Sequence, residues 1–200
     1  MSRASGRTSR RGEATRETIL VSARKLFTQR GYHKTSVYDL FENAGITKGA
    51  FFHHWKTKEE LALEILDSVR IAFEEKFFST VQAEGRAREK IERSLRTLGD
   101  LSHDSSWVYG KIFAIWCAEL DSDQDQLGPA VHALKARWCR YWKELIERAQ
   151  HEHDLRADIS AENLSFLVIS AIFGVQLMST ESKTENVKTA LETLRRALLT

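Results

Sequence analysis

Cysteine and proline are scarce in this 200-residue chain, which has two cysteines and one proline. The cysteines, Cys117 and Cys139, are too few for the disulfide framework of a small secreted domain, so the sequence favours a reducing compartment. A redox pair is one interpretation of them, but two buried free thiols are the commoner case and are preferred. The sequence also lacks stretches in which apolar and polar residues alternate, so it predicts helices and no strands.

Nothing in the sequence predicts a secretion signal or a membrane span. The basic start, residues 1–13, is not followed by the apolar stretch that a signal peptide requires. The most apolar run, Leu164 to Met178, is predicted to be too short and too polar to cross a bilayer. It is interrupted by Ser165, Ser170, Gly174 and Gln176. A cytoplasmic location is therefore expected.

Motifs that would indicate an enzyme, a cofactor or a metal are also missing. There is no Gly-rich phosphate loop, zinc-ligand spacing or nucleophile elbow. The His and acidic residues at 151–154 are a weak metal candidate, because positions i and i+2 of a helix do not share a face. A frayed, solvated helix end is the preferred interpretation of that segment. We expect no catalytic residues, no cofactor and no metal.

Charge is present in both signs but is unevenly distributed. Residues 1–60 hold 12 Lys and Arg against 6 Asp and Glu, whereas residues 61–200 hold 18 against 22. A basic N-terminal part indicates an anionic partner such as nucleic acid. The 42% of hydrophobic residues is enough to build a core, and the 29% of charged residues favours solubility.

A first short helix is predicted directly after residue 36. Thr35 or Ser36 can cap it, because a hydroxyl at a helix start accepts an otherwise unpaired backbone N–H. Its buried face follows helical spacing and consists of Val37, Leu40 and Phe41. Gly45 ends it, since glycine adopts the left-handed conformation found at helix C-termini.

A second short helix is predicted from Lys48 to about His54, with Thr47 as its cap and with Phe51 and Trp55 turned inward. A capping box at Thr57 then begins a long third helix. Two short helices joined by a glycine-containing turn form a helix-turn-helix. In that motif the N-terminal residues of the second helix contact bases in the DNA major groove.

Residues 15–66 resemble the DNA-binding domain of the TetR/AcrR family of bacterial transcriptional regulators. The resemblance is carried by an ordered set of residues: Thr47, Gly49, Phe51, Phe52, His54, Trp55 and Lys58. It implies a three-helix DNA-binding domain and a helical C-terminal domain that holds an inducer. Phe52 departs from the family pattern, which usually has a Tyr whose hydroxyl contacts a phosphate. The Phe52 ring can still pack against the DNA backbone.

The expected fold is all-α and has three parts. These are a disordered basic tail over residues 1–13, a helix-turn-helix domain over 14–60, and a helical ligand-binding and dimerisation domain over 61–200. Arginines of the tail can reach a DNA backbone or minor groove, or the tail can be solvated and do little, and composition leaves both open. Helices are predicted over about 15–30, 57–83, 107–120, 129–151 and 161–180, with another ending near 103 and a last one after a capping box at Ser182.

The predicted DNA contacts lie in the helix-turn-helix. Lys48 can donate to guanine O6 or N7, and Gly49 lets the helix approach closely. Phosphate contacts are expected through hydroxyls, one ammonium and helix N-termini. The full predicted set is Thr35, Ser36, Thr47, Lys48, Gly49, Phe52, His53 and Lys58. His54 and Trp55 are expected to pack within the domain.

The C-terminal part is rich in aromatic residues. Tryptophan is rarely fully buried and its N–H requires a partner, so such a group can line a cavity or can be plain core. The residues alone favour core, whereas the family resemblance favours a cavity for an effector. The predicted ligand-binding set is His103, Trp107, Phe113, Trp116, Cys117, Trp138, Tyr141 and Trp142.

The helix near residues 161–180 is apolar nearly all round, so it must be covered on all sides. A second copy of the last two helices can cover it, and the family resemblance implies such a homodimer. The alternative is that it is the central helix of a monomer. A two-fold dimer would place two recognition helices over half-sites about 34–36 Å apart, or a multiple of that distance.

The sequence is thus interpreted as a dimeric transcriptional regulator, a repressor that a small hydrophobic or aromatic ligand releases from a palindromic operator. One alternative is a ligand-independent or partner-controlled DNA-binding protein with a solid C-terminal core. Another is a helical enzyme or carrier with a vestigial DNA-binding domain. Steep salt dependence of DNA binding would distinguish a regulator from the last of these.

Overall fold

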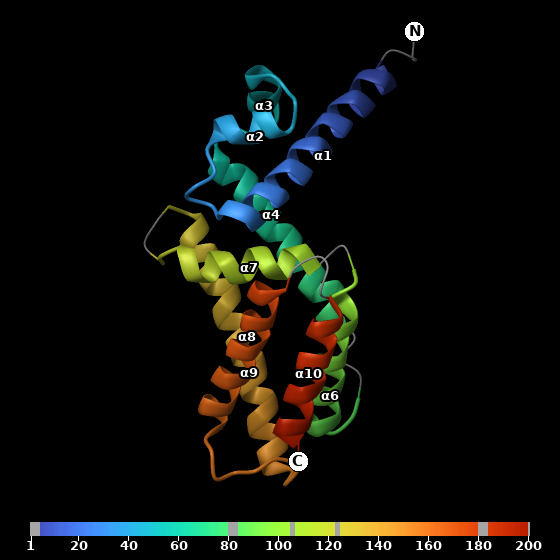
Figure 1. Cartoon of the computed structure of the whole chain (residues 1–200), viewed down its shortest axis with the longest axis vertical. Coiled ribbons are helices and arrows are strands. Elements are labelled where there is room, and N and C mark those ends of the chain that lie inside the picture. Colours follow the sequence, from blue (N-terminus) through green and yellow to red (C-terminus); the bar gives the residue numbers. More distant parts are fainter. Residues whose placement is uncertain (1–4, 80–83, 105–106, 123–124, 180–183, 200) are drawn as a thin grey trace.

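The computed structural model describes residues 5–79, 84–104, 107–122, 125–179 and 184–199. These residues form nine α-helices, one π-helical turn and no strand. The predicted all-α fold is confirmed. The helices are arranged as a small bundle above a larger one, and α4 runs from the first into the second (Figure 1).

The upper bundle contains α1, α2, α3 and the start of α4. Their bounds are Ser5–Arg30, Val37–Asn43, Lys48–His54 and Lys58–Ala72. All three predicted helix starts are confirmed, because the side chains of Ser36, Thr47 and Thr57 accept the N–H groups of Asp39, Ala50 and Glu60, respectively. Of the two candidate caps for α2, Ser36 is the one that acts.

Helix α1 begins ten residues earlier than the sequence indicated. It starts at Ser5, and its first part projects beyond the rest of the upper bundle (Figure 1). Residues 5–13 are therefore helical, and the expected disordered tail over 1–13 is corrected for them. A helix that is anchored by buried residues extends outward at little cost, because nucleation has already occurred. Residues 1–4 lie outside the described part of the chain.

The lower bundle contains the π-helical turn η1 and five α-helices. Their bounds are Phe73–Phe78 for η1, Ala87–Leu101 for α6, Trp107–Glu119 for α7, Leu127–His151 for α8, Ala161–Met178 for α9 and Thr184–Leu199 for α10. The helix expected over 57–83 is thus α4 followed by η1, and its last four residues lie outside the described part. The capping box predicted from Ser182 also falls outside the residues whose side chains are described.

Two hydrophobic clusters hold the bundles together. The first joins α1, α3 and α4 to α7, and includes Phe27, Phe51, Ile65 and Trp116. The second fills the lower bundle and includes Ile91, Trp142, Val168 and Leu191. Helix α7 crosses directly beneath the upper bundle (Figure 1). A movement inside the lower bundle can therefore reach the upper one through α4 and α7.

The end of α8 is ordered rather than frayed, which corrects the expectation for residues 151–154. Glu152 accepts the backbone N–H of Ala87 at 2.8 Å, and Asp154 accepts from the guanidinium of Arg86 at 2.8 Å. These contacts cap the start of α6. Among the described residues, no group of three His, Cys, Asp or Glu side chains is arranged to hold a metal ion.

Helix α9 has the length and composition of a membrane span, contrary to the expectation for residues 164–178. The helix begins at Ala161 and so has 18 residues, and its mean hydropathy is 1.5. In this structure 39% of that stretch is buried within the chain, against α7, α8 and α10. Core helices of soluble proteins meet the same criteria.

Candidate DNA interface and effector-binding core

The first residues of helix α3 face solvent, while a buried ring later in the helix anchors it to the bundle. Thr47, Lys48 and Gly49 are all exposed, whereas Phe51 is fully buried. The Lys48 ammonium lies 5.8 Å from the centre of the Phe52 ring, which is 43% exposed. A charged amine and an apolar ring therefore share the outer face of α3. The structure brings together the predicted contacts Thr47, Lys48, Gly49, Phe52 and His53.

Glycine at position 49 has no role in packing the chain itself. A Cβ atom added there would meet nothing within 4 Å. Glycine in a helix interior lowers stability relative to alanine by roughly 0.5–1 kcal/mol, so an unneeded glycine is a cost. The space in front of Gly49 is therefore open to a partner outside the chain.

Two of the predicted phosphate contacts, Thr35 and Lys58, have side chains that bind the chain itself in this structure, and their contact with DNA stays a prediction. Thr35 is fully buried, and its hydroxyl donates to the carbonyl of Gly31 at 2.7 Å. The Lys58 ammonium donates to the carbonyls of Tyr32 and Thr35, both at 2.9 Å, and lies 4.0 Å from the Tyr32 ring centre. Burial lowers the pKa of Lys58. Both side chains fix the turn between α1 and α2 instead of facing outward.

At the start of α2, Ser36 is exposed as expected, and Tyr38 is an exposed aromatic residue that the sequence analysis did not single out. Ser36 is exposed, but its hydroxyl donates to Asp39, and these hydrogen bonds lower the pKa of the Asp39 carboxyl. Tyr38 is an exposed aromatic whose hydroxyl donates to Glu42 at 3.1 Å. Its position beside the buried stripe of Val37 and Leu40 is the signal that could have identified it as a surface ring.

Two carboxylates join the bundles, one from each bundle, and each accepts backbone N–H groups of the other bundle. Glu119 of α7 accepts the backbone N–H groups of Tyr32 and His33, each at 2.7 Å. Glu59 of α4 accepts those of Gln126 and Leu127, at 2.6 and 3.2 Å. We call this pair of contacts the interdomain clamp. Each carboxylate belongs to one bundle and binds the main chain of the other, so the clamp sets their relative orientation.

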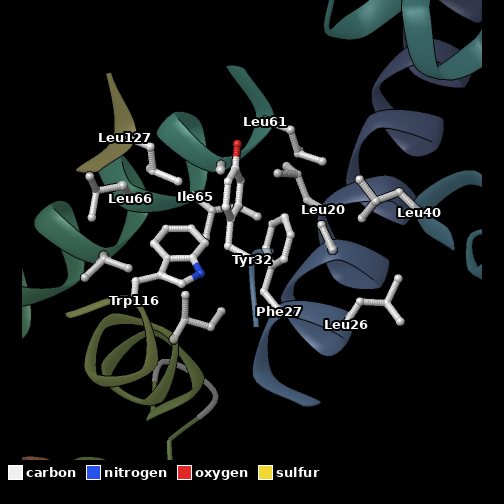
Figure 2. Packing of buried hydrophobic residues seen from close by; sticks show 14 of the residues in the cluster. Leu20, Leu26, Phe27, Tyr32, Leu40, Leu61, Ile65, Leu66, Trp116 and Leu127 are labelled. Carbon is white, nitrogen blue, oxygen red and sulfur yellow. The ribbon is translucent and has the colours of Figure 1, made fainter. Parts of the chain in front are cut away.

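Trp116 lies inside that junction and not in the lower core. Its ring meets Phe27 at 5.5 Å and Tyr32 at 6.4 Å between centroids, and Figure 2 shows it between α7 and the residues of α4 and α1. Burial raises the pKa of Tyr32 to about 12, so its hydroxyl stays protonated. Trp116 is therefore part of the joint between the bundles.

A cluster of six rings links η1 to α8, and we call it the α4–α8 aromatic cluster. Centroid distances are 4.7 Å for Phe77 and Trp138, 5.2 Å for Phe78 and Tyr141, and 5.6 Å for Tyr141 and Trp142. Its members are Phe73, Phe77, Phe78, Trp138, Tyr141 and Trp142. The predicted residues Trp138, Tyr141 and Trp142 are thus brought together.

The other predicted ligand contacts are spread over different places. The Phe113 ring lies 5.6 Å from the Phe73 ring of the cluster, between centroids. Trp107 packs against the hydrophobic core of the lower bundle, and its indole N–H donates to the Ser179 hydroxyl at 3.2 Å. Cys117 packs against the first hydrophobic cluster, and burial raises the pKa of the Cys117 thiol to about 12. His103 is exposed beyond the end of α6. The eight residues therefore do not lie together in the described structure, and their role in ligand binding stays a prediction.

Three grooves open elsewhere on the described part of the lower bundle, one of them, of about 580 Å³, beside the end of α8 and the end of α10. Another, of about 420 Å³, lies between α4 and α8 and is lined by Leu63, Leu66, Asp67, Arg70, Ala130, Ala133, Leu134 and Arg137. The third, of about 560 Å³, lies between α6 and α10. At the end of the groove between α4 and α8, Arg70 and Arg137 both donate to Glu74, at 2.7 and 2.6 Å, which lowers the pKa of Glu74.

A capped recognition helix on a three-helix bundle, joined to an all-helical second domain, defines a helix-turn-helix regulator. Residues 19–65 match the family model for bacterial regulatory proteins of the tetR family, and residues 87–198 match that for the tetracyclin repressor-like C-terminal domain. The second match spans more than half of the chain. The protein belongs to the TetR family of regulators, and the predicted resemblance is confirmed.

Two relatives illustrate the range of sequence similarity. The HTH-type transcriptional regulator LmrA of Bacillus subtilis (strain 168) is 24% identical over 170 residues, which cover 84% of this chain and 88% of LmrA. The HTH-type transcriptional repressor KstR2 of Mycobacterium tuberculosis is 41% identical over 58 residues, which cover 29% of this chain and 26% of KstR2. The similar proteins that we compared carry names of regulators and not of enzymes.

Solved structures agree with the fold over nearly the whole length. The MbdR regulator from Azoarcus sp. CIB has a TM-score of 0.76 at 23% identity, covering 92% of this chain and 97% of MbdR. AibR, solved in complex with isovaleryl coenzyme A and operator DNA, has a TM-score of 0.76 at 19% identity, covering 92% of this chain and 98% of AibR. At these identities the likeness concerns the fold.

Proposed function

We propose that the protein is a transcriptional repressor that binds a palindromic operator as a homodimer and is released by a small hydrophobic or aromatic effector. The observation that carries the DNA-binding part is α3, whose exposed start holds Lys48 beside an open Gly49 on a fully buried Phe51. The excess of basic residues in the first 60 positions supports an anionic partner. The names of the regulator and repressor relatives support the same assignment.

Lys48→Ala tests the DNA face directly. Loss of a base contact from the start of α3 is expected to weaken operator binding by about 1–3 kcal/mol and to relax preference at one base pair. The measurement is binding to an operator recovered by selection from random duplexes, over a series of salt concentrations. Lys143→Ala in α8 is the matched control, because Lys143 lies in the lower bundle, and should bind as the parent protein does. Unchanged binding by Lys48→Ala would place the DNA face elsewhere.

Gly49→Ala separates the needs of the fold from those of DNA binding. Since a Cβ at position 49 meets nothing in the chain, the free protein should gain about 0.5–1 kcal/mol in unfolding free energy from the better helix former. Operator affinity should fall, because the added methyl group stands where α3 approaches the groove. Denaturant unfolding and operator binding measured on the same preparation check both signs. A variant with higher stability and full affinity would contradict a close approach at Gly49.

The proposed release mechanism is a population shift transmitted through α4. Helix α4 begins in the DNA-binding domain and continues through η1 into the α4–α8 aromatic cluster. The interdomain clamp ties the same two domains at Glu119 and Glu59. An effector that prefers the arrangement with the wrong spacing of the recognition helices shifts the equilibrium toward it, by no more than its difference in affinity for the two arrangements.

The proposed dimer forms through α9. Four of the large apolar side chains that are exposed among the described residues lie on this helix, and they include Phe166 at 72% and Met178 at 84% exposure. In contrast, α10 buries its apolar stripe, Val187 and Leu191, against α6 in the same chain. The structure thus supports α9 more than the predicted pair of last helices. A second copy covering α9 also fits a cytoplasmic protein better than lipid does.

A further inference from the structure

The outer face of α3 is formed by exposed residues of different chemistry. These are Lys48, Gly49, Phe52 and His53. Lys48 and His53 can form hydrogen bonds, and Gly49 leaves open space in front of the helix. Phe52 is the apolar side chain of this face. Residues three and four apart in a helix are neighbours on its surface, so Phe52 adjoins both Gly49 and Lys48.

Two contacts hold the Phe52 ring on this face. Its centroid lies 5.3 Å from that of the fully buried Phe51, and the two ring planes are at 82° to each other. The Lys48 ammonium lies 5.8 Å from the centre of the Phe52 ring. An edge-to-face contact with a buried ring restricts the directions open to Phe52. Its exposed part is therefore presented next to the ammonium of Lys48.

A phenyl ring can make only an apolar contact with DNA bases. It has no hydroxyl group, so it cannot donate a hydrogen bond to a phosphate oxygen or to a base edge. The 5-methyl group of thymine is the apolar group that the major groove presents, and phenylalanine is among the residues that contact it. Phe52 lies one helical turn after Lys48, so a groove that the Lys48 ammonium enters is also within reach of the Phe52 ring.

We propose that Phe52 reads a thymine 5-methyl group in each half-site of the operator, beside the base that Lys48 contacts. This inference rests on the proposed function and assigns one of the bases that the protein recognises. Four residues of an α-helix advance about 6 Å, and successive bases of one strand are about 3.4 Å apart. The thymine should therefore lie within about two base pairs of the base that Lys48 contacts.

The methyl contact should differ from the phosphate contacts in its response to salt. Each phosphate that the protein neutralises releases counterions, so its contribution falls as the salt concentration rises. A phenyl ring on a methyl group releases none. The share of the affinity that depends on the thymine methyl group should consequently be the same at every salt concentration.

The test is a uracil scan of an operator duplex that the full-length protein selects from random duplexes. Each thymine is replaced in turn by uracil, which removes one methyl group and keeps the base pair. Burial of one methyl group is worth a factor of about four in affinity. The parent protein should therefore bind about fourfold more weakly when uracil replaces one particular thymine of a half-site, and about sixteenfold more weakly when it does so in both half-sites.

Variants of α3 then show which residue reads the methyl group. Phe52→Ala should bind the thymine and uracil duplexes equally, whereas Phe52→Tyr keeps the ring and should retain the fourfold difference. His53→Ala is the matched control, because His53 is the next residue on the same exposed face. Whatever its effect on total affinity, it should show the same fourfold difference as the parent protein.

The outcomes separate this inference from the proposed function. If the parent protein is insensitive to every uracil, and Phe52→Ala weakens binding to all duplexes by one factor, the ring packs on the sugar–phosphate backbone and the inference is overturned. A difference between thymine and uracil that persists in Phe52→Ala would overturn it as well, because another residue would read the methyl group. If the parent protein selects no duplex at all, the proposed DNA-binding function itself fails.

Discussion

Gly31→Ala is expected to lower the unfolding free energy by about 3–5 kcal/mol, from left-handed backbone strain and from loss of charge-assisted hydrogen bonds. Gly31 has a φ of +78°, and an added Cβ would stand 2.5 Å from Oε2 and 2.8 Å from Oε1 of Glu119. The Glu119 carboxylate would have to withdraw and would release the N–H groups of Tyr32 and His33. Denaturant unfolding at a fixed protomer concentration measures the effect.

Gly45→Ala is the matched control for this prediction. Gly45 has a similar φ of +65°, but a Cβ there would meet nothing within 4 Å. It should cost only the backbone strain, about 1–2 kcal/mol. In a Glu119→Ala background, Gly31→Ala should cost no more than Gly45→Ala does, because the clamp is already gone. Equal costs of the two glycine substitutions in the parent protein would show that Glu119 contributes nothing at this junction.

The helix-turn-helix could be predicted closely because its signals are local. Ser36, Thr47 and Thr57 each cap the helix that follows directly in sequence, and the turn glycine lies between two short amphipathic segments. Such interactions span three or four residues, so spacing alone reveals them. The side chains of Phe51 and Trp55 turned inward for the same reason.

The orientation of a side chain could not be predicted where it depends on contacts with residues far away in the sequence. Lys58 faces inward because the start of α4 lies against the turn after α1, more than twenty residues earlier in the chain. Trp116 and Trp138 both lie on the apolar face of a predicted C-terminal helix, so the sequence does not distinguish them. In the structure α7 crosses beneath the upper bundle, and Trp116 joins the hydrophobic cluster of that bundle while Trp138 joins the other one. Helical periodicity places a residue on a face of its own helix but does not say which other helix covers that face.

The π-helical turn could not be predicted from the sequence pattern either. The spacing of Phe73, Phe77 and Phe78 fits an ordinary helix, and nothing local distinguishes i+5 from i+4 hydrogen bonding.

The second prediction with a large expected effect concerns α9. Leu167→Arg should convert the proposed dimer to monomers, because it places a charge on a face whose exposed apolar residues extend to Met178. A Cβ at Gly174, which lies between them, meets nothing within 4 Å, so the middle of this face is open to close approach by a second helix. A small residue at the crossing point lets two helices approach closely, and the large apolar side chains on either side of it then pack against the second helix.

Loss of the dimer should weaken operator binding by a factor of about 10² to 10⁴, since the second half-site contact ceases to be intramolecular. Analytical ultracentrifugation and operator titration check the two effects together. Val21→Arg is the matched control for the oligomeric state, because Val21 is 53% exposed, close to the 59% of Leu167, but lies on α1. A dimer that persists in Leu167→Arg, or a parent protein that is monomeric at micromolar concentration, would contradict pairing through α9. If both variants dissociate, the effect is not specific to α9, which would also contradict the proposed interface.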